Sequence, residues 1–353
     1  MSEPIDISHV EVIAPNLKRR LSGVTSVIIQ IVPEQCRIGT KVATLGPGLP
    51  DSLPKIPLKA LPELLVGPKE RPFRIWHARR NTEMLAGLVL NRFFRAPLKL
   101  VFTSEAQRKH SRYTKWLMRH MDKIITTSTP SASFLELPHD IIPHGIDLDR
   151  FRPPSDDERD WAASGLPGKY GIGCFGRIRH QKGTDLYVDA LIDLLPDYPD
   201  WTAAVFGRVT ADNRAYAATL HEKVEAAGLS DRIYFMGEVA DIKPWYRRIN
   251  LCVAPSRNEG FGLTPLEAMA SETAVVSSDA GAYRDIVAVD ETGQVAPAGD
   301  LEALKAAIKT YLDDPKLAAR HARAGLERAR TNFALEKEAK ALETAYRQLW
   351  EQA

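Results

Sequence analysis

The hydrophobic positions of the chain form short apolar runs separated by longer stretches in which apolar residues recur every three or four positions. Such short runs predict buried strands, and the periodic stretches predict helices. In the first half, strands are predicted at Val24–Val32, Lys41–Leu45, Arg74–His77, Leu98–Thr103 and Lys123–Thr127, and helices at Thr82–Phe94 and Gln107–Met121. This alternation is typical of an α/β unit with a parallel sheet.

The same alternation begins again after a polar stretch. Residues 153–167 contain two prolines and a DDERD run, and they predict a linker. Beyond it, strands are predicted at Tyr170–Phe175, Thr202–Phe206, Ile233–Met236, Leu251–Ala254 and Ala274–Ser277, and helices at Asp185–Leu195, Asn213–Ala227, Leu263–Ala270 and from Leu301 onward. The pattern therefore predicts two doubly wound Rossmann-like domains, 1–152 and 168–334, facing a central cleft.

The composition agrees with an ordinary globular protein. The chain has 353 residues, of which 44% are hydrophobic and 26% charged, so each domain can bury its own core. The start, MSEPIDIS, lacks the apolar segment of a signal peptide, and no apolar run reaches the roughly 20 residues of a membrane span. Cys174 and Cys252 lie in apolar runs and, with Cys36, make an odd number, which favours buried thiols over disulfides. We expect a cytoplasmic protein.

Charge is distributed unevenly along the chain. Residues 1–150 carry 22 Lys and Arg against 14 Asp and Glu, whereas the remainder carries 25 against 31. Most of the excess lies between Lys55 and Lys123, with 16 basic and 5 acidic residues. The asymmetry indicates an anionic partner for the first half. Nucleic acid would fit the charge, but no nucleic-acid module or interleaved aromatic pattern accompanies it.

One loop after a predicted strand carries two cations. Gly176 and Arg177 follow the strand Tyr170–Phe175, and Lys182 comes five residues later, at the sheet edge where such folds bind ligands. A planar Arg fork and a compact Lys charge both suit a diphosphate. On its own, this pair would be interpreted more simply as two solvated loop cations.

A second loop, PSRNEGFGLTPLEAMA, changes that interpretation. Gly260 and Gly262 allow close backbone approach, and the helix that opens near Leu263 presents N–H groups to an anion; Phe261 completes the turn. Glu259 precedes this helix and Glu267 lies one turn into it, where each could accept hydrogen bonds from sugar or ribose hydroxyls. The alternative is a capping acid and an exposed helical Glu. Because cleaving a sugar–phosphate bond leaves charge on the diphosphate, the two loops together predict a glycosyltransferase.

These segments resemble the retaining glycosyltransferase family 4 of GT-B architecture. The resemblance covers most of residues 140–300 through the strings HGID, GR…KG, VFG, FMGEV, APSRNEGFGLTPLEAMA and TGQVAPAGD. It implies that Arg177 and Lys182 bind the donor diphosphate, that Glu259 faces the donor sugar and that Glu267 holds the ribose. It also implies transfer without a bound metal or cofactor.

The first half departs from the family pattern. The usual Gly-rich turn after the first strand has only Gly23 as a candidate, and Glu272 stands where a Gly commonly follows the helix. Glu105 occupies the place of a His that the family often puts near the donor sugar. The resemblance then implies either a modified catalytic role for Glu105 or a contact from His77 instead. It also implies that a final helix, 335–353, packs back on the first domain.

Two strings, IWHARRN and FTSEAQRKHS, resemble bacterial lipopolysaccharide core mannosyltransferases. That resemblance implies GDP-mannose as donor, an anionic glycolipid acceptor of the Kdo-type inner core, and peripheral contact with the inner membrane. Candidate residues for acceptor or membrane contact are Arg79, Arg80, Arg108, Lys109, Arg112, Lys115 and Trp116. As a helix, Gln107–Lys123 would have a cationic and an apolar face, suited to anionic lipid or, alternatively, to packing on its own sheet.

Other functions stay open at this point. The same architecture could use a UDP- or ADP-linked glucose-type donor, or act as a nucleotide-sugar 2-epimerase that releases a free sugar. An electrostatic binding protein would use the basic first half alone, although we expect no nucleic-acid partner. A dinucleotide oxidoreductase is disfavoured because no GxGxxG opens either sheet.

Overall fold

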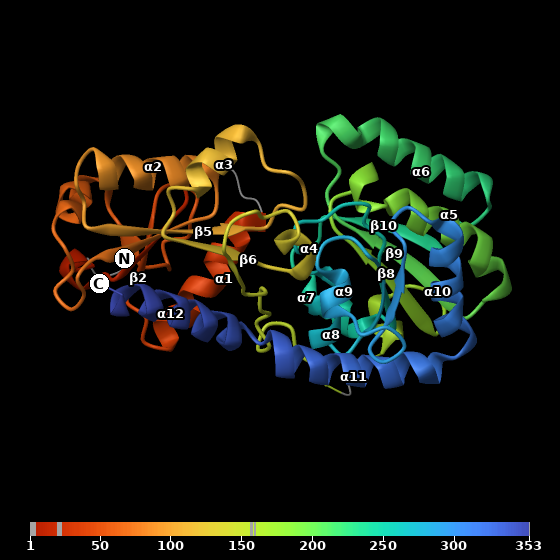
Figure 1. Ribbon diagram of the computed structural model, residues 1–353. Helices are drawn as coiled ribbons and strands as arrows, with labels where there is room; N and C mark the ends of the chain where they lie inside the picture. Colours follow the sequence, from red (N-terminus) through yellow and green to blue (C-terminus); the bar gives the residue numbers. More distant parts are fainter. Residues whose placement is uncertain (1–4, 20–22, 156–157, 159, 353) are drawn as a thin grey trace. The chain divides into compact units, whose positions relative to one another are not determined.

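The computed structural model describes residues 5–19, 23–155, 158 and 160–352. The chain divides into two compact units, the first made of residues 1–145 and 335–353 and the second of residues 146–334 (Figure 1). The division therefore falls after residue 145 rather than 152. The stretch expected as a linker, 153–167, belongs to the second unit, where Trp161 is 2% exposed in a hydrophobic core.

The first unit is built on a seven-stranded parallel sheet with the order β3-β2-β1-β4-β5-β6-β7. Its strands are β1 (Val12–Pro15), β2 (Val42–Leu45), β3 (Lys55–Ile56), β4 (Arg74–Ala78), β5 (Leu98–Ser104), β6 (Lys123–Thr126) and β7 (Asp140–Ile141). Its helices are α1 (Gly23–Arg37), α2 (Asn81–Arg92), α3 (Arg112–Met118), α4 (Thr129–Ala132) and α12 (Leu335–Glu351), with 3-10 turns at Ile7–His9 and Leu58–Leu65. Four of the five predicted strands are confirmed within a residue or so.

The predicted strand Val24–Val32 is wrong, because this segment is part of helix α1. Its β-branched residues favour a strand, but the buried positions are Val27, Ile28, Ile31 and Val32, which is the spacing of one helical face. That face packs against α12 and the sheet. The first strand is instead the short run Val12–Pro15, which pairs with both β2 and β4.

The helix predicted at Gln107–Met121 is also shorter than expected. It begins at Arg112, because Ser111 accepts a hydrogen bond from the Thr114 N–H at 3.1 Å and caps it. Arg108 and Lys109 therefore lie in the loop before α3 and do not share a helical face with the cations behind them.

Helix α12 returns to the first unit at the end of the chain. Leu342, Tyr346 and Trp350 lie in the same hydrophobic core as strand β4 and helix α1. The Trp350 indole also donates to the Phe73 carbonyl at 3.1 Å. The last helix thus supplies one wall of the first unit's core.

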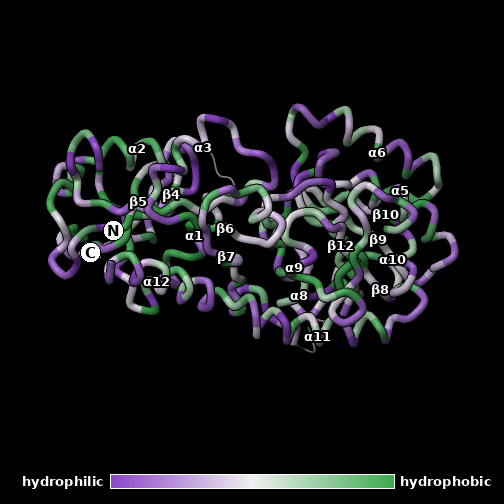
Figure 2. Tube along the Cα trace, in the orientation of Figure 1, coloured by the Kyte–Doolittle hydropathy of each residue, from purple (hydrophilic) through white to green (hydrophobic). Residues whose placement is uncertain are grey.

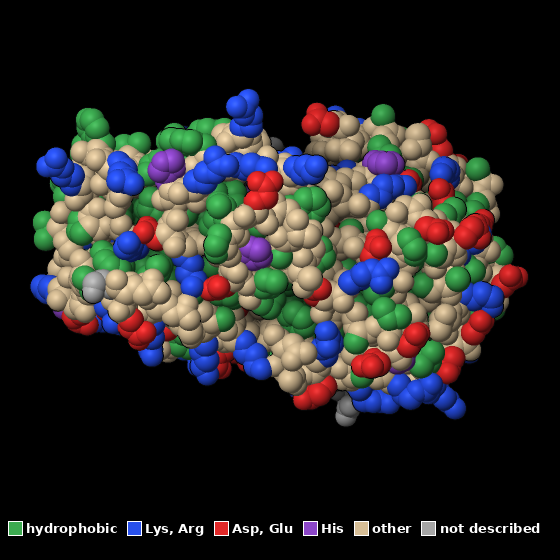
Figure 3. Space-filling view, in the orientation of Figure 1, with side chains coloured by type: hydrophobic (Ala, Val, Ile, Leu, Met, Phe, Trp, Pro, Cys, Tyr) green, Lys and Arg blue, Asp and Glu red, His purple; other side chains and the backbone are tan. Residues whose placement is uncertain are grey.

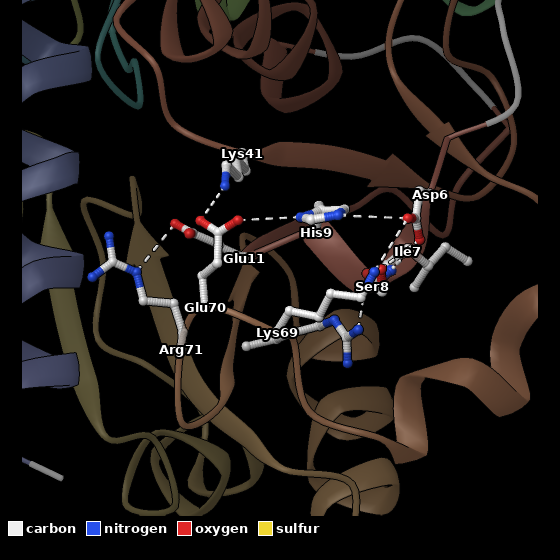
Figure 4. A network of polar contacts seen from close by, with 10 residues as sticks. Asp6, Ile7, Ser8, His9, Glu11, Lys41, Lys69, Glu70 and Arg71 are labelled. Carbon is white, nitrogen blue, oxygen red and sulfur yellow. Dashed lines mark hydrogen bonds and ion pairs between the residues drawn. The ribbon is translucent and has the colours of Figure 1, made fainter.

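The N-terminal segment is fastened to the same unit by polar contacts. Figure 4 shows His9 between the carboxylates of Asp6 and Glu70, with Lys41 also at Glu70. Arg74, which is 1% exposed, donates to the carbonyls of Ile7 and Val10 at 2.9 and 3.0 Å. Lys41 and Arg74, two cations of the first unit, therefore have structural partners within it.

The second unit contains a six-stranded parallel sheet with the order β10-β9-β8-β11-β12-β13. Its strands are β8 (Tyr170–Phe175), β9 (Trp201–Phe206), β10 (Ile233–Gly237), β11 (Leu251–Ala254), β12 (Ala274–Ser278) and β13 (Gln294–Ala296). Its helices are α5 (Thr184–Leu194), α6 (Arg214–Ala226), α7 (Lys243–Arg248), α8 (Thr264–Ala270), α9 (Tyr283–Ile286), α10 (Leu301–Asp313) and α11 (Pro315–Phe333). Figure 2 shows hydrophilic residues along much of α6 and α11.

The predicted elements of this half are confirmed. The strands are buried except at Tyr170 of β8 and in β10 and β13, and they alternate with helices as the apolar pattern predicts. Cys174 and Cys252 lie inside them as buried free thiols. Along the described part of the chain, no helix combines the length and the apolar character that crossing a membrane requires.

Candidate active site

The second unit's sheet has a topological switch point between β8 and β11. From β8 the chain moves outward through β9 and β10, and it then returns to place β11 on the other side of β8. The loops that follow these two strands therefore lie next to each other at the carboxyl edge, where open α/β sheets bind ligands. Both predicted donor-site motifs are on these loops.

Main-chain and side-chain contacts hold the two loops together. The Arg257 N–H donates to the Gln181 carbonyl at 2.9 Å, and Gln181 Nε2 donates to the Asn258 carbonyl at 3.2 Å. The Arg257 guanidinium also binds both oxygens of Asp185 at 2.7 Å. A strap of this kind fixes the geometry of the site before any ligand arrives.

Glycines make the approach of the loops possible. Gly183 has φ +70°, and a Cβ there would lie 1.9 Å from the Pro255 carbonyl oxygen, so no other residue fits without moving a loop. Gly176, with φ +131°, lies directly under the Lys182 side chain: a Cβ there would be 3.6 Å from Lys182 Cε. The two glycines of the GR…KG string are therefore needed for the packing of this turn, and its Arg and Lys supply the cations.

Lys182 and Glu259 form an ion pair across the two loops. Lys182 Nζ contacts Glu259 Oε1, which also accepts a hydrogen bond from Ser256 Oγ at 2.9 Å. The two side chains are 19% and 12% exposed. Arg177 is exposed on the same loop as Lys182. The structure thus brings together Gly176, Lys182 and Glu259 and places Arg177 beside them in the chain.

Glu267 has a different environment from Glu259. It lies in the first turn of α8, partly buried, and accepts a hydrogen bond from Tyr246 Oη at 2.7 Å. Burial raises the pKa of Glu267, against the opposing effects of Tyr246, Lys182 and Arg150. Tyr246 is a partner that the sequence motifs did not indicate.

The turn between the two glutamates is packed from below. Phe261 is 4% exposed in the core, and a Cβ on Gly262, whose φ is +86°, would lie 2.4 Å from the Tyr283 ring. Gly260 and Leu263 flank these residues on the partly exposed side. Phe261 and Gly262 therefore shape the loop from its inner side.

The first unit has its own switch point, between β1 and β4, and a partly buried cation, Arg80, lies there. Arg80, which follows β4, donates to Asn16 Oδ1 at 2.8 Å, Thr25 Oγ1 at 3.0 Å and Glu83 Oε1 at 2.7 Å. Gly23 opens α1 near this point, and a Cβ there would meet no atom within 4 Å, so nothing in the geometry requires a glycine. Arg80 is thus bonded to the protein itself.

Beside this switch point is a pocket of about 650 Å³ on the first unit. It lies at the carboxyl ends of β4 and β5 and is lined by Arg79, Asn81, Ser104, Glu105, Arg108 and Lys109, among others. Arg79 is 8% exposed, whereas Arg108 and Lys109 are exposed at the surface. Of the predicted acceptor residues, these three share one pocket.

Glu105 is tied to a buried charge cluster behind the pocket. Its Oε1 lies 3.2 Å from His144 Nε2, and His144 Nδ1 lies 2.9 Å from Oε1 of Glu338 on α12. Burial lowers the pKa of His144, but Glu338 and Glu105 outweigh it and raise the pKa to about 10, so the imidazole is charged. Burial would raise the pKa of Glu105, and the contact with His144 and the nearby charges of His144 and Arg79 lower it overall.

His77, the alternative to Glu105, is a buried residue of β4. Its ring nitrogens lie 2.6 Å from Tyr346 Oη and 2.6 Å from Thr103 Oγ1, and the side chain is 1% exposed. Burial and the charges of Arg79 and His144 hold the pKa of His77 well below its ordinary value, so the ring is neutral. These contacts give it a structural role in joining α12 to the sheet.

The remaining predicted residues lie on the outer face of α3. Arg112 is exposed, Lys115 is paired with Glu136 at 2.5 Å, and Trp116 is 45% exposed and stacked on Tyr113 with ring centres 6.4 Å apart. None of the three lines the pocket around Arg79 as described. The residues predicted to contact the acceptor or membrane therefore fall into three groups. Three line the pocket, three lie on the outer face of α3, and Arg80 has a structural role.

Comparison with known proteins supplies the family. The family described as "Glycosyl transferases group 1" matches residues 156–328. The chain is 60% identical over 344 residues to the lipopolysaccharide core biosynthesis mannosyltransferase LpcC of Rhizobium leguminosarum bv. viciae, covering 98% of both chains. The chain belongs to the group 1 glycosyltransferases. This glycosyltransferase is also 52% identical over 349 residues to the corresponding mannosyltransferase LpsB of Rhizobium meliloti (strain 1021), covering 98% of this chain and 99% of that one.

Solved structures confirm the fold of this glycosyltransferase. Anabaena Alr3699/HepE in complex with UDP matches with a TM-score of 0.81 and 19% identity, covering 96% of this chain and 100% of that chain. At that identity the match supports the GT-B architecture and nothing about ligands. Among the described residues, no cluster of three or more His, Cys, Asp or Glu could hold a metal ion. Transfer without metal stays a prediction.

Proposed function

We propose that this glycosyltransferase moves mannose from GDP-mannose to a Kdo-type inner-core acceptor of lipopolysaccharide, with retention of configuration. The observation that carries the proposal is the full-length similarity to two lipopolysaccharide core mannosyltransferases, at 60% and 52% identity. The strapped Lys182–Glu259 pair supports it, because it places a cation and a carboxylate at the switch point. The nucleotide sugar is a substrate, and we propose no cofactor.

The proposed roles follow from the contacts of each residue. The donor diphosphate would replace Glu259 as the ion-pair partner of Lys182. Arg177 would be the second cation that stabilises the leaving diphosphate. Released from Lys182, Glu259 could accept hydrogen bonds from the sugar while Ser256 still holds its orientation. Glu267, positioned by Tyr246, would hold the ribose. Two protein cations would then supply the charge that a metal ion supplies in other transferases.

We further propose that the first unit rests on the cytoplasmic face of the inner membrane. Helix α2 exposes Leu85 and Val89, and Phe93 and Phe94 are exposed directly after its last residue. Helix α3, which packs beside α2, exposes Trp116. Arg92 at the end of α2, Arg95 shortly after it, and Arg112 on α3 are exposed cations. Figure 3 shows hydrophobic side chains over α2 with Lys and Arg side chains nearby. Aromatic and basic residues on one face suit an anionic lipid surface.

Calorimetric binding of GDP, UDP and ADP to the purified protein in EDTA tests the donor assignment. We expect selective GDP binding without metal, followed by transfer of mannose to a synthetic Kdo acceptor and an α-linked product by NMR. A preference for UDP or ADP would keep the transferase but remove mannose. Release of a free epimerised sugar in the absence of acceptor would favour the 2-epimerase instead.

A further inference from the structure

The pocket on the first unit has an unbalanced positive charge. Three of its lining residues, Arg79, Arg108 and Lys109, are cations, and the one lining carboxylate, Glu105, contacts the charged His144, which also pairs with Glu338. A volume of about 650 Å³ is in the range of pockets that hold a small ligand. Asn81 and Ser104 in the same wall could bind hydroxyl groups.

Arg79 is the inner cation of this pocket and has unused hydrogen-bonding capacity. It is 8% exposed, and its Nε is buried without a hydrogen bond to any described residue. Within the described residues its guanidinium makes a single hydrogen bond, a long one of 3.5 Å from Nη1 to the His77 carbonyl, although its charge also acts on Glu105. Its neighbour Arg80, by contrast, is bonded to Asn16, Thr25 and Glu83. A buried guanidinium with open donors is costly unless an anion completes it.

We propose that this pocket binds the carboxylate of an anionic sugar in the acceptor, with Arg79 as the inner cation and Arg108 and Lys109 at the rim. The inference rests on the proposed function and assigns the acceptor to one site. It also separates Arg79, Arg108 and Lys109 from Arg112, Lys115 and Trp116, which belong to the outer face. A planar guanidinium fork matches a carboxylate through two parallel hydrogen bonds.

A water-soluble acceptor pair tests the proposal without altering the protein. The wild-type enzyme receives a Kdo glycoside and the same glycoside with its carboxylate converted to the carboxamide. We expect kcat/KM to fall by about 10- to 100-fold for the carboxamide, the value of a charge-assisted contact. Equal rates for the two acceptors would overturn the proposal. A loss that follows removal of a phosphate from a phosphorylated acceptor, instead of the carboxylate, would overturn the carboxylate assignment.

The variant Arg79→Gln locates the site. It should lose the same 10- to 100-fold on the carboxylate acceptor and show no further loss on the carboxamide, so that discrimination disappears. Arg119→Gln is the matched control, since it removes an exposed cation outside the pocket and should keep full discrimination. Arg79→Lys should recover part of the loss because it restores charge but not the fork.

Two measurements keep the outcomes distinct. An unchanged urea unfolding curve shows that Arg79→Gln is folded, including the first unit. If the variant does not fold, the comparison of the two acceptors with the wild-type enzyme still tests the proposal. Acceptor binding measured by NMR in the absence of donor separates the site from the reaction. If the carboxylate acceptor binds at Arg79 but no transfer occurs, the proposed function is contradicted and the binding site is still supported. If transfer occurs and Arg79→Gln discriminates as well as the wild type, only the binding site is contradicted.

Discussion

The two units have similar doubly wound sheets but use their switch points differently. Between β8 and β11, Lys182 and Glu259 meet with 19% and 12% of their side chains exposed, so a ligand can compete for either. Between β1 and β4, the corresponding pair is Arg80 and Glu83, with 10% and 0% exposed. The first pair is held in a place that a ligand can reach, and the second is part of the core.

The difference shows that topology alone does not identify a site. In the first unit Asn16 and Thr25 also accept hydrogen bonds from Arg80, and the cation with an unpaired donor is the preceding residue, Arg79. The functional question at each switch point is therefore whether the charged group is already satisfied by the protein. The predictions below test that distinction.

The largest expected effect is at the second switch point. Lys182→Ala should leave a folded protein and lower kcat at least a hundredfold, roughly 3 kcal/mol of barrier, because the departing diphosphate loses a fixed cation. Lys223→Ala, which breaks an exposed pair with Asp189 in the same unit, is the matched control and should keep normal turnover. Near-normal kcat in Lys182→Ala would remove the proposed role.

At the first switch point the expected effect is on stability. Arg80→Ala should lower the free energy of unfolding by about 3 kcal/mol, since it leaves the buried Glu83 carboxylate without its charged partner and with only the Arg79 N–H. Arg92 is exposed at the end of α2, the helix that contains Glu83, and Arg92→Ala should change the free energy of unfolding by less than about 0.5 kcal/mol. Urea unfolding checks both. A loss below about 1 kcal/mol for Arg80→Ala would mean that the buried Glu83 does not depend on this ion pair.

Much of the second unit could be predicted because its information is local. Each strand is a short apolar run, and the residues of the site lie in two segments, 176–183 and 255–267, that directly follow strands. What the sequence could not supply are partners from other elements. His144 and Glu338 are separated by 194 positions, and no pattern within either segment indicates that they meet.

The errors in the first unit have particular physical causes. Segment 24–32 has strand-forming residues in a helical spacing, and tertiary packing against α12 favours the helix. The predicted helix included Gln107 to His110, but Ser111 is the N-cap, so the helix begins after these residues. Glu272 adopts φ +55°, which accounts for the Gly that the family usually has at this position.

A third prediction concerns the charge cluster that joins Glu105 to α12. Because the pKa of His144 is raised to about 10 from an ordinary value near 6.5, its stabilising contribution is complete below about pH 6.5 and is lost as the pH rises through about 10. The groups that face it are Glu105, Glu338, His77 and Arg79.

The free energy of unfolding should therefore fall from pH 7 to pH 9 by about 2 kcal/mol more in the wild type than in His144→Gln/Glu338→Gln, which replaces the ion pair by neutral amides. Urea unfolding at each pH measures the two slopes. Parallel slopes would mean that His144 is neutral in the folded protein, and the proposed link between the pocket and α12 would lose its electrostatic basis.

The smallest expected effect separates the outer face from the pocket. Phe93 and Phe94 are 79% and 51% exposed at the end of α2, so replacing both with Ser removes apolar surface without opening the core. Phe93→Ser/Phe94→Ser should weaken binding to vesicles containing anionic lipid by about tenfold, since only part of each ring would enter the interface. Val289→Ser, a 45% exposed position of the second unit, is the control and should bind normally. Rates on a water-soluble acceptor should not change in either variant, because the outer face and the Arg79 pocket are distinct surfaces; a parallel loss of soluble activity would show that they are not.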